Sequence, residues 1–530
     1  MATGGMTRWV ARLYPFLIAL IPVLNYAARN PAQFRFQGLA LMIGAALVGC
    51  GLVYALAALL TRGRAPAALP PFVALLATVA FFAYPQLGVR ISATPGDPPH
   101  ALLVPITLAV FAAVVWWVWR REALLEGMGK FFTLMGALLV GWSTVQIGIA
   151  WLEGRRTIAR SELASELARP IGGPTQPREP RRDIYVIVLD EYANSAVLRE
   201  RFGYDNGPFE DSLRALGFHV PRLVRSNYLH TLLSVPSMLN SAHLDRLQQE
   251  LGASKHPALP NYLVEHNRVA RYLEKRGYHH VFFPSQWWQS TSGSSVADTE
   301  FRPWSGFNFM RSMAAGELER TIRGASILRY FDRTHRWEAD HVRRILRGLA
   351  ALPRDPDPTF AFAHILKPHD PFVFDSECAT LRRGRETDKV GPYLEQLECV
   401  NQLLLATVRA ILRASDVPPI IILQGDHGSK LLGATGYSHV DKVPPAAARE
   451  RLGAFGAYFL PGGGAAAFGD TVTVVNVLGD VLRHYFGADL PRAGDEHYLS
   501  TVERPYEFRR VDAPWLAVVD SGDLNLRAGR

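Results

Sequence analysis

Hydrophobic positions are distributed unevenly along the chain and divide it into two parts. Residues 1–152 are dominated by Leu, Ala, Val, Phe and Trp, and their charges are confined to short clusters. Five apolar stretches in this part contain no charged residue and approach or exceed the roughly 18–20 residues that cross a hydrocarbon core. These stretches are Leu13–Ala28, Phe36–Thr61, Ala65–Val89, Pro98–Trp119 and Phe131–Leu152. Five such runs in succession favour transmembrane helices over the buried helices of a soluble protein.

The charges between the spans indicate an orientation. With the N-terminus in the cytoplasm, Lys and Arg residues are more numerous in the inner loops than in the short outer loops, as the positive-inside tendency requires. Arg155, Arg156 and Arg160 follow the fifth span and oppose this tendency. We expect a multi-pass protein of the cell (inner) membrane whose remaining residues lie outside the cytoplasm.

Polar residues dominate after the fifth span. Residues 153–168 have the pattern of a polar helix at the membrane surface, and the Pro, Gly and Arg content up to residue 182 is typical of a linker. We expect a folded domain at residues 183–500 and a C-terminal tail at residues 501–530.

Short apolar runs alternate with helical patterns in the folded domain. The runs Ile184–Leu189, His280–Phe283, Thr359–Ile365 and Pro419–Leu423 are typical of buried strands, and helical patterns cover Gly207–Gly217, Tyr262–Arg276 and Tyr393–Arg413. Strands that alternate with helices predict an α/β domain with a mostly parallel sheet. In such sheets the ligand binds beyond the carboxyl ends of the strands.

Charge and cysteine content narrow the class of protein. The net charge is +9, but the arginines are scattered, which favours attraction to anionic lipid headgroups over nucleic-acid binding. Three cysteines are too few for a disulfide scaffold. Cys50 lies in an apolar run, and the sequence leaves open whether Cys378 and Cys399 pair.

Carboxylate and imidazole groups follow three of the predicted strands. Asp190 and Glu191 come after the first, His369 after the third, and Asp426 with His427 after the fourth. Each residue taken singly has an ordinary structural explanation. Their coincidence at one rim predicts a divalent-metal site for Zn²⁺ or Mn²⁺, with either Asp190 or Glu191 as the first ligand.

A hydroxyl-rich segment supplies a candidate nucleophile. Thr231 is placed like an N-cap of a short apolar helix, and capping that helix is one explanation for it. In the functional interpretation, the hydroxyl faces the positive end of the helix, where a phosphate would bind. A metal ion would lower the pKa of the hydroxyl and activate it.

Together these segments resemble a known family. DIYVIVLDEYA, TLLSVPSM and GDHG occur in the order found in the alkaline-phosphatase and sulfatase superfamily. Five spans followed by such a domain resemble bacterial phosphoethanolamine transferases and lipoteichoic-acid synthases. TLLSVPSM is similar to the T-x-x-S-V-P-C-M nucleophile segment of the transferases.

The resemblance implies roles for individual residues. Asp190, Thr231, Asp426 and His427 would hold one metal, and His369 in KPHDPF would grip the transferred phosphate or a second metal together with His439. Three features depart from the relatives: their first ligand is usually Glu, they contain several disulfides, and the sulfatase motif C/S-x-P-x-R is absent here.

The predicted function is phospho-group transfer through Thr231 from a phospholipid donor to a lipid-linked or glycan acceptor of the cell envelope. The alternatives are a phosphoric or sulfuric ester hydrolase and an inactive sulfatase-like binding protein. A transporter or channel is disfavoured because the spans lack charged residues at midplane depth.

One long aromatic segment, Pro284–Arg311, has two interpretations. It could line the substrate cleft, where Trp287, Trp288 and Trp304 would stack on a sugar or meet lipid. Packing of these side chains over the sheet is the alternative.

Overall fold

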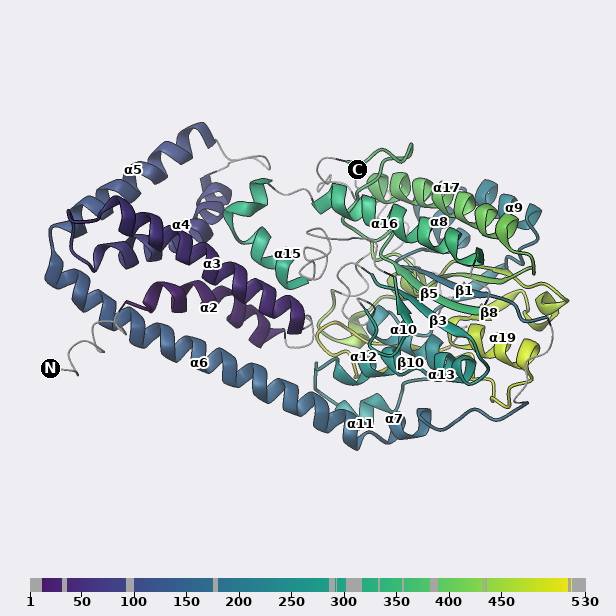
Figure 1. Ribbon diagram of the computed structural model, residues 1–530. Helices are drawn as coiled ribbons and strands as arrows, with labels where there is room; N and C mark the ends of the chain where they lie inside the picture. Colours follow the sequence, from purple (N-terminus) through teal and green to yellow (C-terminus); the bar gives the residue numbers. More distant parts are fainter. Residues whose placement is uncertain are drawn as a thin grey trace. The chain divides into compact units, whose positions relative to one another are not determined.

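The chain forms two compact units. The computed structural model describes residues 12–30, 36–91, 100–174, 180–285, 291, 293–301, 317–331, 334–354, 357–381, 389–431, 433, 436–512 and 516. The helical unit comprises Met1–Glu153 and Gly306–Asp332, and the α/β unit comprises Gly154–Ser305 and Arg333–Arg530 (Figure 1). Trp287, Trp288 and Trp304 lie outside the described residues. The same holds for residues 513–515 and 517–530 of the expected C-terminal tail.

Apolar helices make up the helical unit. They are α2 (Tyr14–Arg29), α3 (Phe36–Leu60), α4 (Leu69–Ile91), α5 (His100–Trp119) and α6 (Glu122–Arg160). Four of the five expected spans are confirmed as helices long and apolar enough to cross a membrane, α3 to α6, whereas α2, at the first expected span, has only 16 residues. Leu52, Leu108 and Leu138 are among the large apolar side chains that these helices expose. Such exposure suits contact with lipid and not with water.

The polar segment after the last span continues the same helix. α6 runs without a break for 39 residues and ends at Arg160, beyond the expected boundary at residue 152. The side chain of Ser161 then accepts a hydrogen bond from Ala164 N and starts the short helix α7 (Glu162–Leu167). The expected polar helix is therefore the end of α6 followed by α7.

A later part of the chain belongs to the helical unit. α15 (Glu317–Gly324) and the 3₁₀ helix η2 (Ile327–Phe331) lie between strands of the α/β unit in sequence. Leu318 and Ile322 of α15 pack against Val23 and Leu24 of α2, and Tyr330 of η2 stacks edge-on against an α4 tyrosine. This segment shares the apolar core of the first helices.

A six-stranded sheet organises the α/β unit. The strand order is β4-β3-β5-β1-β6-β7, and the first five strands are parallel while β7 runs antiparallel to β6. The strands of this sheet are β1 (Ile184–Leu189), β3 (His279–Phe283), β4 (Thr299–Glu300), β5 (Thr359–Ile365), β6 (Ile420–Gly425) and β7 (Gly456–Phe459). The expected mostly parallel α/β architecture is confirmed.

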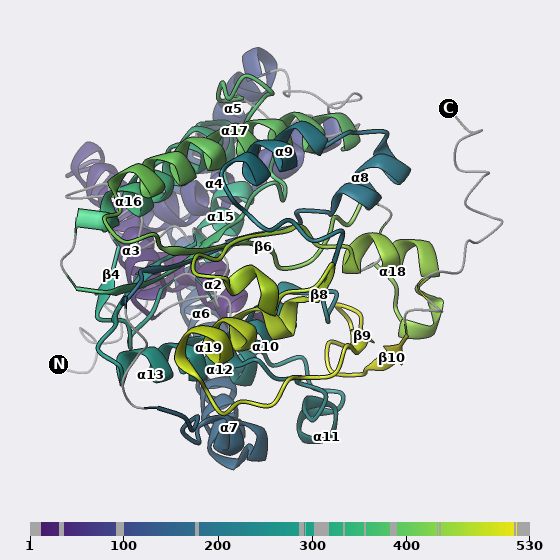
Figure 2. The same ribbon diagram turned by 90° about the vertical axis from the view of Figure 1, so that its right-hand side faces the viewer.

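Helices cover both faces of this sheet (Figure 2). α8 (Ser195–Phe202), α9 (Gly207–Ala215), α16 (Thr334–Ala351) and α17 (Val390–Ala414) pack on one face, and α10 (Thr231–Asn240), α13 (Arg268–Glu274) and α19 (Val477–Phe486) on the other. Each face of the sheet has its own hydrophobic core, and β1 contributes alternate side chains to the two cores. Tyr185 and Ile187 pack in the first core, and Val186 and Val188 pack in the second. This two-sided burial explains why β1 is a continuous apolar run.

The remaining α-helices and strands have three to eight residues. They are β2 (Leu223–Arg225), α11 (Leu247–Leu251), α12 (Ala258–Glu265), α18 (Pro445–Leu452), β8 (Thr471–Thr473), β9 (His497–Leu499) and β10 (Arg509–Val511). The prediction of a single helix over Tyr262–Arg276 is wrong, because α12 ends before Asn267. The Asn267 side chain accepts a hydrogen bond from Ala270 N and begins α13 as a separate helix.

Candidate metal centre

Three adjacent strands end at the same level of the sheet. Leu189 at the end of β1 lies opposite Ile365 of β5 and Gly425 of β6. Asp190 N donates to Ile365 O at 3.0 Å, and Asp426 N donates to Leu189 O at 3.2 Å. The two carboxylates therefore leave neighbouring strands side by side, at the rim where parallel sheets bind ligands.

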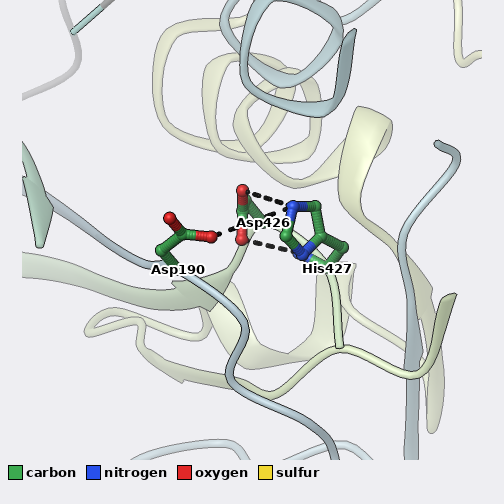
Figure 3. A group of neighbouring side chains, drawn as sticks. All are labelled: Asp190, Asp426 and His427. Carbon is green, nitrogen blue, oxygen red and sulfur yellow. Dashed lines mark hydrogen bonds and ion pairs between the residues drawn. The ribbon is translucent and has the colours of Figure 1, made fainter. Parts of the chain in front are cut away.

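Asp190, Asp426 and His427 form one buried group. Figure 3 shows both carboxylates pointing toward the imidazole, and one ligand atom from each residue lies within 4.8 Å of the others. His427 Nε2 is 3.1 Å from Asp426 Oδ2 and 3.9 Å from Asp190 Oδ1. These two carboxylate oxygens accept no hydrogen bond from the described residues. Buried oxygens of this kind require a proton or a cation.

The other oxygen of Asp426 is held by the backbone. Asp426 Oδ1 accepts hydrogen bonds from Glu191 N at 3.3 Å and from His427 N at 2.9 Å. Burial raises the pKa of Asp426 well above its usual value, and the nearby charge of Asp190 raises it further. Two carboxylates this close repel each other, so a bound cation would stabilise both in the ionised form.

The surroundings of His427 select one tautomer. Its Nδ1 lies 3.2 Å from Gly428 O, and its Nε2 accepts a hydrogen bond from Arg451 Nη2 at 3.1 Å. Burial, together with the charge of Arg451, lowers the pKa of His427 well below its usual value. The ring is therefore neutral, with the proton on Nδ1 and a lone pair on Nε2, which is the arrangement that a metal-ligating histidine requires.

Gly428 lets this loop lie close to α18. Gly428 N donates to Arg451 O at 2.7 Å. A Cβ atom at this position would collide with the backbone oxygens of Glu450 and Gly453. The second glycine of the GDHG motif, Gly428, is therefore required because the backbone of α18 approaches it so closely.

Thr231 lies beside this group at the start of α10. Its Oγ1 is 3.0 Å from His427 Nε2, and the side chain is buried. The expected N-cap assignment is off by one residue, because His230 occupies the cap and its carbonyl oxygen accepts from Leu233 N and Ser234 N. Thr231 is the first helical residue, so its hydroxyl and the helix N-terminus are next to each other.

A cationic group surrounds Glu191. The residue adopts a left-handed backbone conformation (φ 64°), which separates its side chain from that of Asp190. Glu191 Oε1 is 2.7 Å from Arg451 Nη1, 3.2 Å from Lys430 Nζ and 3.6 Å from His369 Nε2. Asp190 thus belongs to the candidate metal group, whereas Glu191 pairs with cations.

The two histidines expected behind the metal group occupy different environments. His369 N donates to Asp190 O at 3.1 Å, and its Nε2 is 2.8 Å from Lys430 Nζ. Burial favours the neutral ring, but the charges of Glu191 and Asp190 outweigh this effect, and the net result is a raised pKa of His369. His439 is exposed before a 3₁₀ turn and makes no hydrogen bond or ion pair with Thr231 or His427 among the described residues.

These donors fit a divalent metal. Two carboxylate oxygens, one imidazole nitrogen and an adjacent hydroxyl suit Zn²⁺ or Mn²⁺. Asp190, Asp426 and His427 would hold the ion, and Thr231 lies within reach of the same place. The unpartnered carboxylate oxygens are the observation on which this fit rests.

Comparison with known proteins identifies the family of this chain. The family model described as Sulfatase matches residues 185–451, just over half of the chain. The chain belongs to the sulfatase family. No curated protein matches it. The sulfatase match spans Thr231, both carboxylates of the metal group and His427, and it ends at Arg451.

Several solved structures are similar to this chain at low sequence identity. The C-terminal periplasmic domain of EcEptC from Escherichia coli in complex with Zn is 11% identical, with 67% of this chain and 98% of that chain covered and a TM-score of 0.41. Lipooligosaccharide phosphoethanolamine transferase A (EptA) from Neisseria meningitidis is 13% identical, with coverages of 90% and 95% and a TM-score of 0.38. An alkaline phosphatase superfamily protein from Vibrio parahaemolyticus is 10% identical, with coverages of 63% and 76% and a TM-score of 0.39.

Several charged residues of the site were not predicted from the sequence. Arg451 lies in α18, far along the chain from Glu191, and no local motif marks it. Lys430 follows His427 by three residues in the GDHGSK segment, and this proximity in sequence could have indicated that Lys430 belongs to the site. Lys367 and Glu338 form a buried ion pair at 3.2 Å behind the His369 loop.

Proposed function

We propose that this protein transfers a phospho-substituent, of phosphoethanolamine or glycerophosphate type, with Thr231 as the nucleophile. The donor is a phospholipid, and the acceptor is a lipid-linked molecule or a glycan of the cell envelope. The observation that carries the proposal is the position of Thr231 Oγ1, 3.0 Å from His427 Nε2 at the N-terminus of α10. Membership of the sulfatase family supports ester chemistry at this site.

The reaction has two displacements. The Thr231 hydroxyl releases its proton to solvent, and Oγ1 forms a bond to phosphorus while the ester bond to the donor's leaving oxygen breaks and that oxygen takes up a proton. The oxygen of the acceptor hydroxyl then attacks the phosphorus and loses its proton, and the bond to Thr231 breaks, after which Oγ1 takes up a proton and is a hydroxyl again. A bound divalent cation supplies Lewis acidity, which lowers the pKa of the hydroxyl and offsets negative charge on the phosphoryl oxygens.

His369 is the proposed proton donor to the leaving oxygen. Its pKa is raised by Glu191 and Asp190 despite burial, which favours the protonated ring. Its Nδ1 is 3.0 Å from Asp370 Oδ1, and its Nε2 accepts a hydrogen bond from Lys430 Nζ at 2.8 Å. Proton donation from Nε2 therefore requires Lys430 to move from His369 to the substrate. His439 remains a candidate for a contact with the substrate from the exposed turn.

The disulfide supports a location outside the cytoplasm. Cys378 and Cys399 are bonded, with their Cα atoms 4.9 Å apart. Structural disulfides persist in oxidising compartments and are rare in the cytosol. We propose that the four membrane-length helices anchor the protein in the cell membrane and that the α/β unit faces the extracytoplasmic side.

Mass spectrometry of the full chain purified from its native membrane tests the nucleophile. We expect an adduct on Thr231 whose mass identifies the transferred group. Thr231→Ser should retain part of the labelling, and Thr231→Ala should abolish it. Ser237→Ala is a matched control, because this buried hydroxyl lies in the same helix and bonds Ser234 O. Full activity of Thr231→Ala against every substrate would overturn the proposal.

The sulfatase match also favours a second candidate, a phosphoric or sulfuric ester hydrolase. In that reaction water takes the place of the acceptor alcohol. Measuring product release with and without an alcohol acceptor separates the two candidates. A transferase gives a new ester only with the acceptor, whereas a hydrolase releases the same product in both cases.

A further inference from the structure

Arg451 is held from several sides at the edge of the metal group. Its Nε donates to Leu229 O at 2.8 Å, and its Nη1 donates to Glu191 Oε1 at 2.7 Å and to Gly428 O at 2.9 Å. The side chain is only 6% exposed. These contacts fix the plane of the guanidinium and leave Nη2 directed at His427 Nε2, 3.1 Å away.

The contact of Nη2 cannot persist once His427 binds a metal. The lone pair on His427 Nε2 accepts the hydrogen bond from Arg451, and a ligating histidine donates the same lone pair to the metal. Among the described residues, Nη2 has no other acceptor. A buried guanidinium N–H without an acceptor costs free energy. With metal bound to His427, Arg451 Nη2 therefore needs a new acceptor in the site.

Lys430 adds a second cation at the same place. Its Nζ is 3.2 Å from Glu191 Oε1, 2.8 Å from His369 Nε2 and 3.3 Å from Asp370 Oδ1. Glu191 thus bridges Arg451 and Lys430 through one oxygen. The carboxylate neutralises part of their charge and holds the two cations near each other.

Building on the proposed function, we propose that Arg451 and Lys430 form the subsite for the substrate's anion, with Glu191 as the residue that positions them. Arg451 Nη2 changes its acceptor from His427 Nε2 to a non-bridging oxygen of the phosphoryl or sulfuryl group when the metal site is filled. Binding of the anion is therefore coupled to binding of the metal. A planar guanidinium suits such oxygens because it offers donors in a fixed geometry.

Thermal unfolding with inorganic phosphate tests this coupling without an identified substrate. The full chain in detergent is loaded with Zn²⁺ or treated with chelator, and the Tm is followed as phosphate is added. We expect phosphate to raise the Tm of the zinc-loaded protein and to bind at least about 10-fold more weakly to the metal-free protein. A parallel titration with sulfate compares the two ester classes, since Arg451-dependent binding of either anion supports the subsite.

Three variants identify the residues responsible. Arg451→Gln should weaken phosphate binding by about 100-fold, comparable to the loss of one oxyanion donor. Lys430→Gln should weaken it by about 10-fold. Lys442→Gln is the matched control, because Lys442 is exposed on a neighbouring turn and should bind phosphate as the wild type does. Zinc content is measured on every variant.

The outcomes separate this proposal from the proposed function. Arg451→Gln that retains both zinc and wild-type phosphate affinity overturns the subsite. If Arg451→Gln loses zinc or fails to fold, the test of the subsite rests on Lys430→Gln. Unchanged phosphate affinity in Lys430→Gln then overturns the subsite. Phosphate binding that depends on these residues, without any adduct on Thr231, would retain the subsite and reject the threonine nucleophile.

Discussion

Thr231 Oγ1 lies 3.0 Å from His427 Nε2, although 196 residues separate the two in the chain. The contact joins the N-terminus of α10 to the loop that follows β6. Ser234, one turn into α10, donates a hydrogen bond to Asp426 O and so makes a second contact between α10 and this loop. The hydroxyl, the imidazole and the buried carboxylates are thus held by one helix and two strand ends, and chelation should affect them together.

Removing the metal should destabilise the α/β unit in a pH-dependent way. A cation at 100 times its Kd stabilises the folded state by about 2.7 kcal/mol, so chelator should lower the Tm. In the metal-free protein the raised pKa of Asp426 keeps a proton that the unfolded chain releases. Its stability should therefore fall as the pH rises above the ordinary aspartate pKa, while the loaded protein should not show this loss.

Asp426→Asn tests that explanation by thermal unfolding and metal analysis. The variant should bind metal more than about 100-fold more weakly, since even the loss of a supporting residue costs 10- to 100-fold. Chelator and the rise in pH should then have little effect on its Tm. The exposed Asp441 provides the control Asp441→Asn. Equal chelator sensitivity in Asp426→Asn and the wild type would contradict the assignment.

Acid should unfold the α/β unit through buried neutral histidines. Burial lowers the pKa of His497 to about 4, although its hydrogen bond to Ser226 O opposes the shift. The unfolded chain takes up this proton near pH 6.5, so stability is complete above that pH and is lost as the pH falls toward 4. The change corresponds to about 3 kcal/mol for this residue. Denaturant titrations at several pH values measure it.

His497→Gln should flatten the acid limb of the stability profile. Glutamine can still donate to Ser226 O but does not titrate, so the loss between pH 6.5 and 4 should become smaller. His439→Gln changes an exposed ring and should leave the profile unaltered. An acid limb of unchanged steepness in His497→Gln would show that other groups account for it.

The ion pair between Lys367 and Glu338 should be costly to break singly. Both side chains are nearly inaccessible, and Lys367 Nζ also donates to Pro371 O at 3.0 Å. Lys367→Met leaves the Glu338 charge buried and should destabilise the fold by about 3–5 kcal/mol. Adding Glu338→Leu should recover much of this loss, which a double-mutant cycle on the free energy of unfolding measures.

The control for that cycle is an exposed pair. Arg199→Met interrupts the ion pair with Asp205, in which both side chains are about two thirds exposed, and should leave the Tm unchanged. Lys367→Met with wild-type stability would show that the pair is not buried in solution.

Thiol labelling should distinguish the three cysteines. Without reductant, a maleimide should modify only Cys50 in the denatured protein, because Cys378 and Cys399 are bonded. After reduction all three should react, and a mass-shift assay counts them. Three modified cysteines before reduction, in protein taken directly from cells, would contradict both the disulfide and the extracytoplasmic placement.

Much of the candidate site was predictable because strands that alternate with helices run parallel in one sheet. β1 and β5 have the bounds that their apolar runs indicated, and β6 differs by one or two residues. Parallel strands place the residues after their carboxyl ends at one rim, so Asp426 and His427 were expected to meet there with either Asp190 or Glu191. α2 and the segment that splits into α12 and α13 were less predictable, because helix ends depend on caps and neighbours.

The sequence by itself determined the division into apolar helices and an α/β domain, the buried strands, and the polar residues that follow them. These features depend on hydrophobic periodicity, which is local. Only the tertiary structure decided that Asp190 and not Glu191 joins Asp426 and His427, and that Arg451 reaches Glu191 across 260 positions. The positive φ of Glu191 and contacts between distant elements determine these pairings, and neither leaves a periodic signal in the chain.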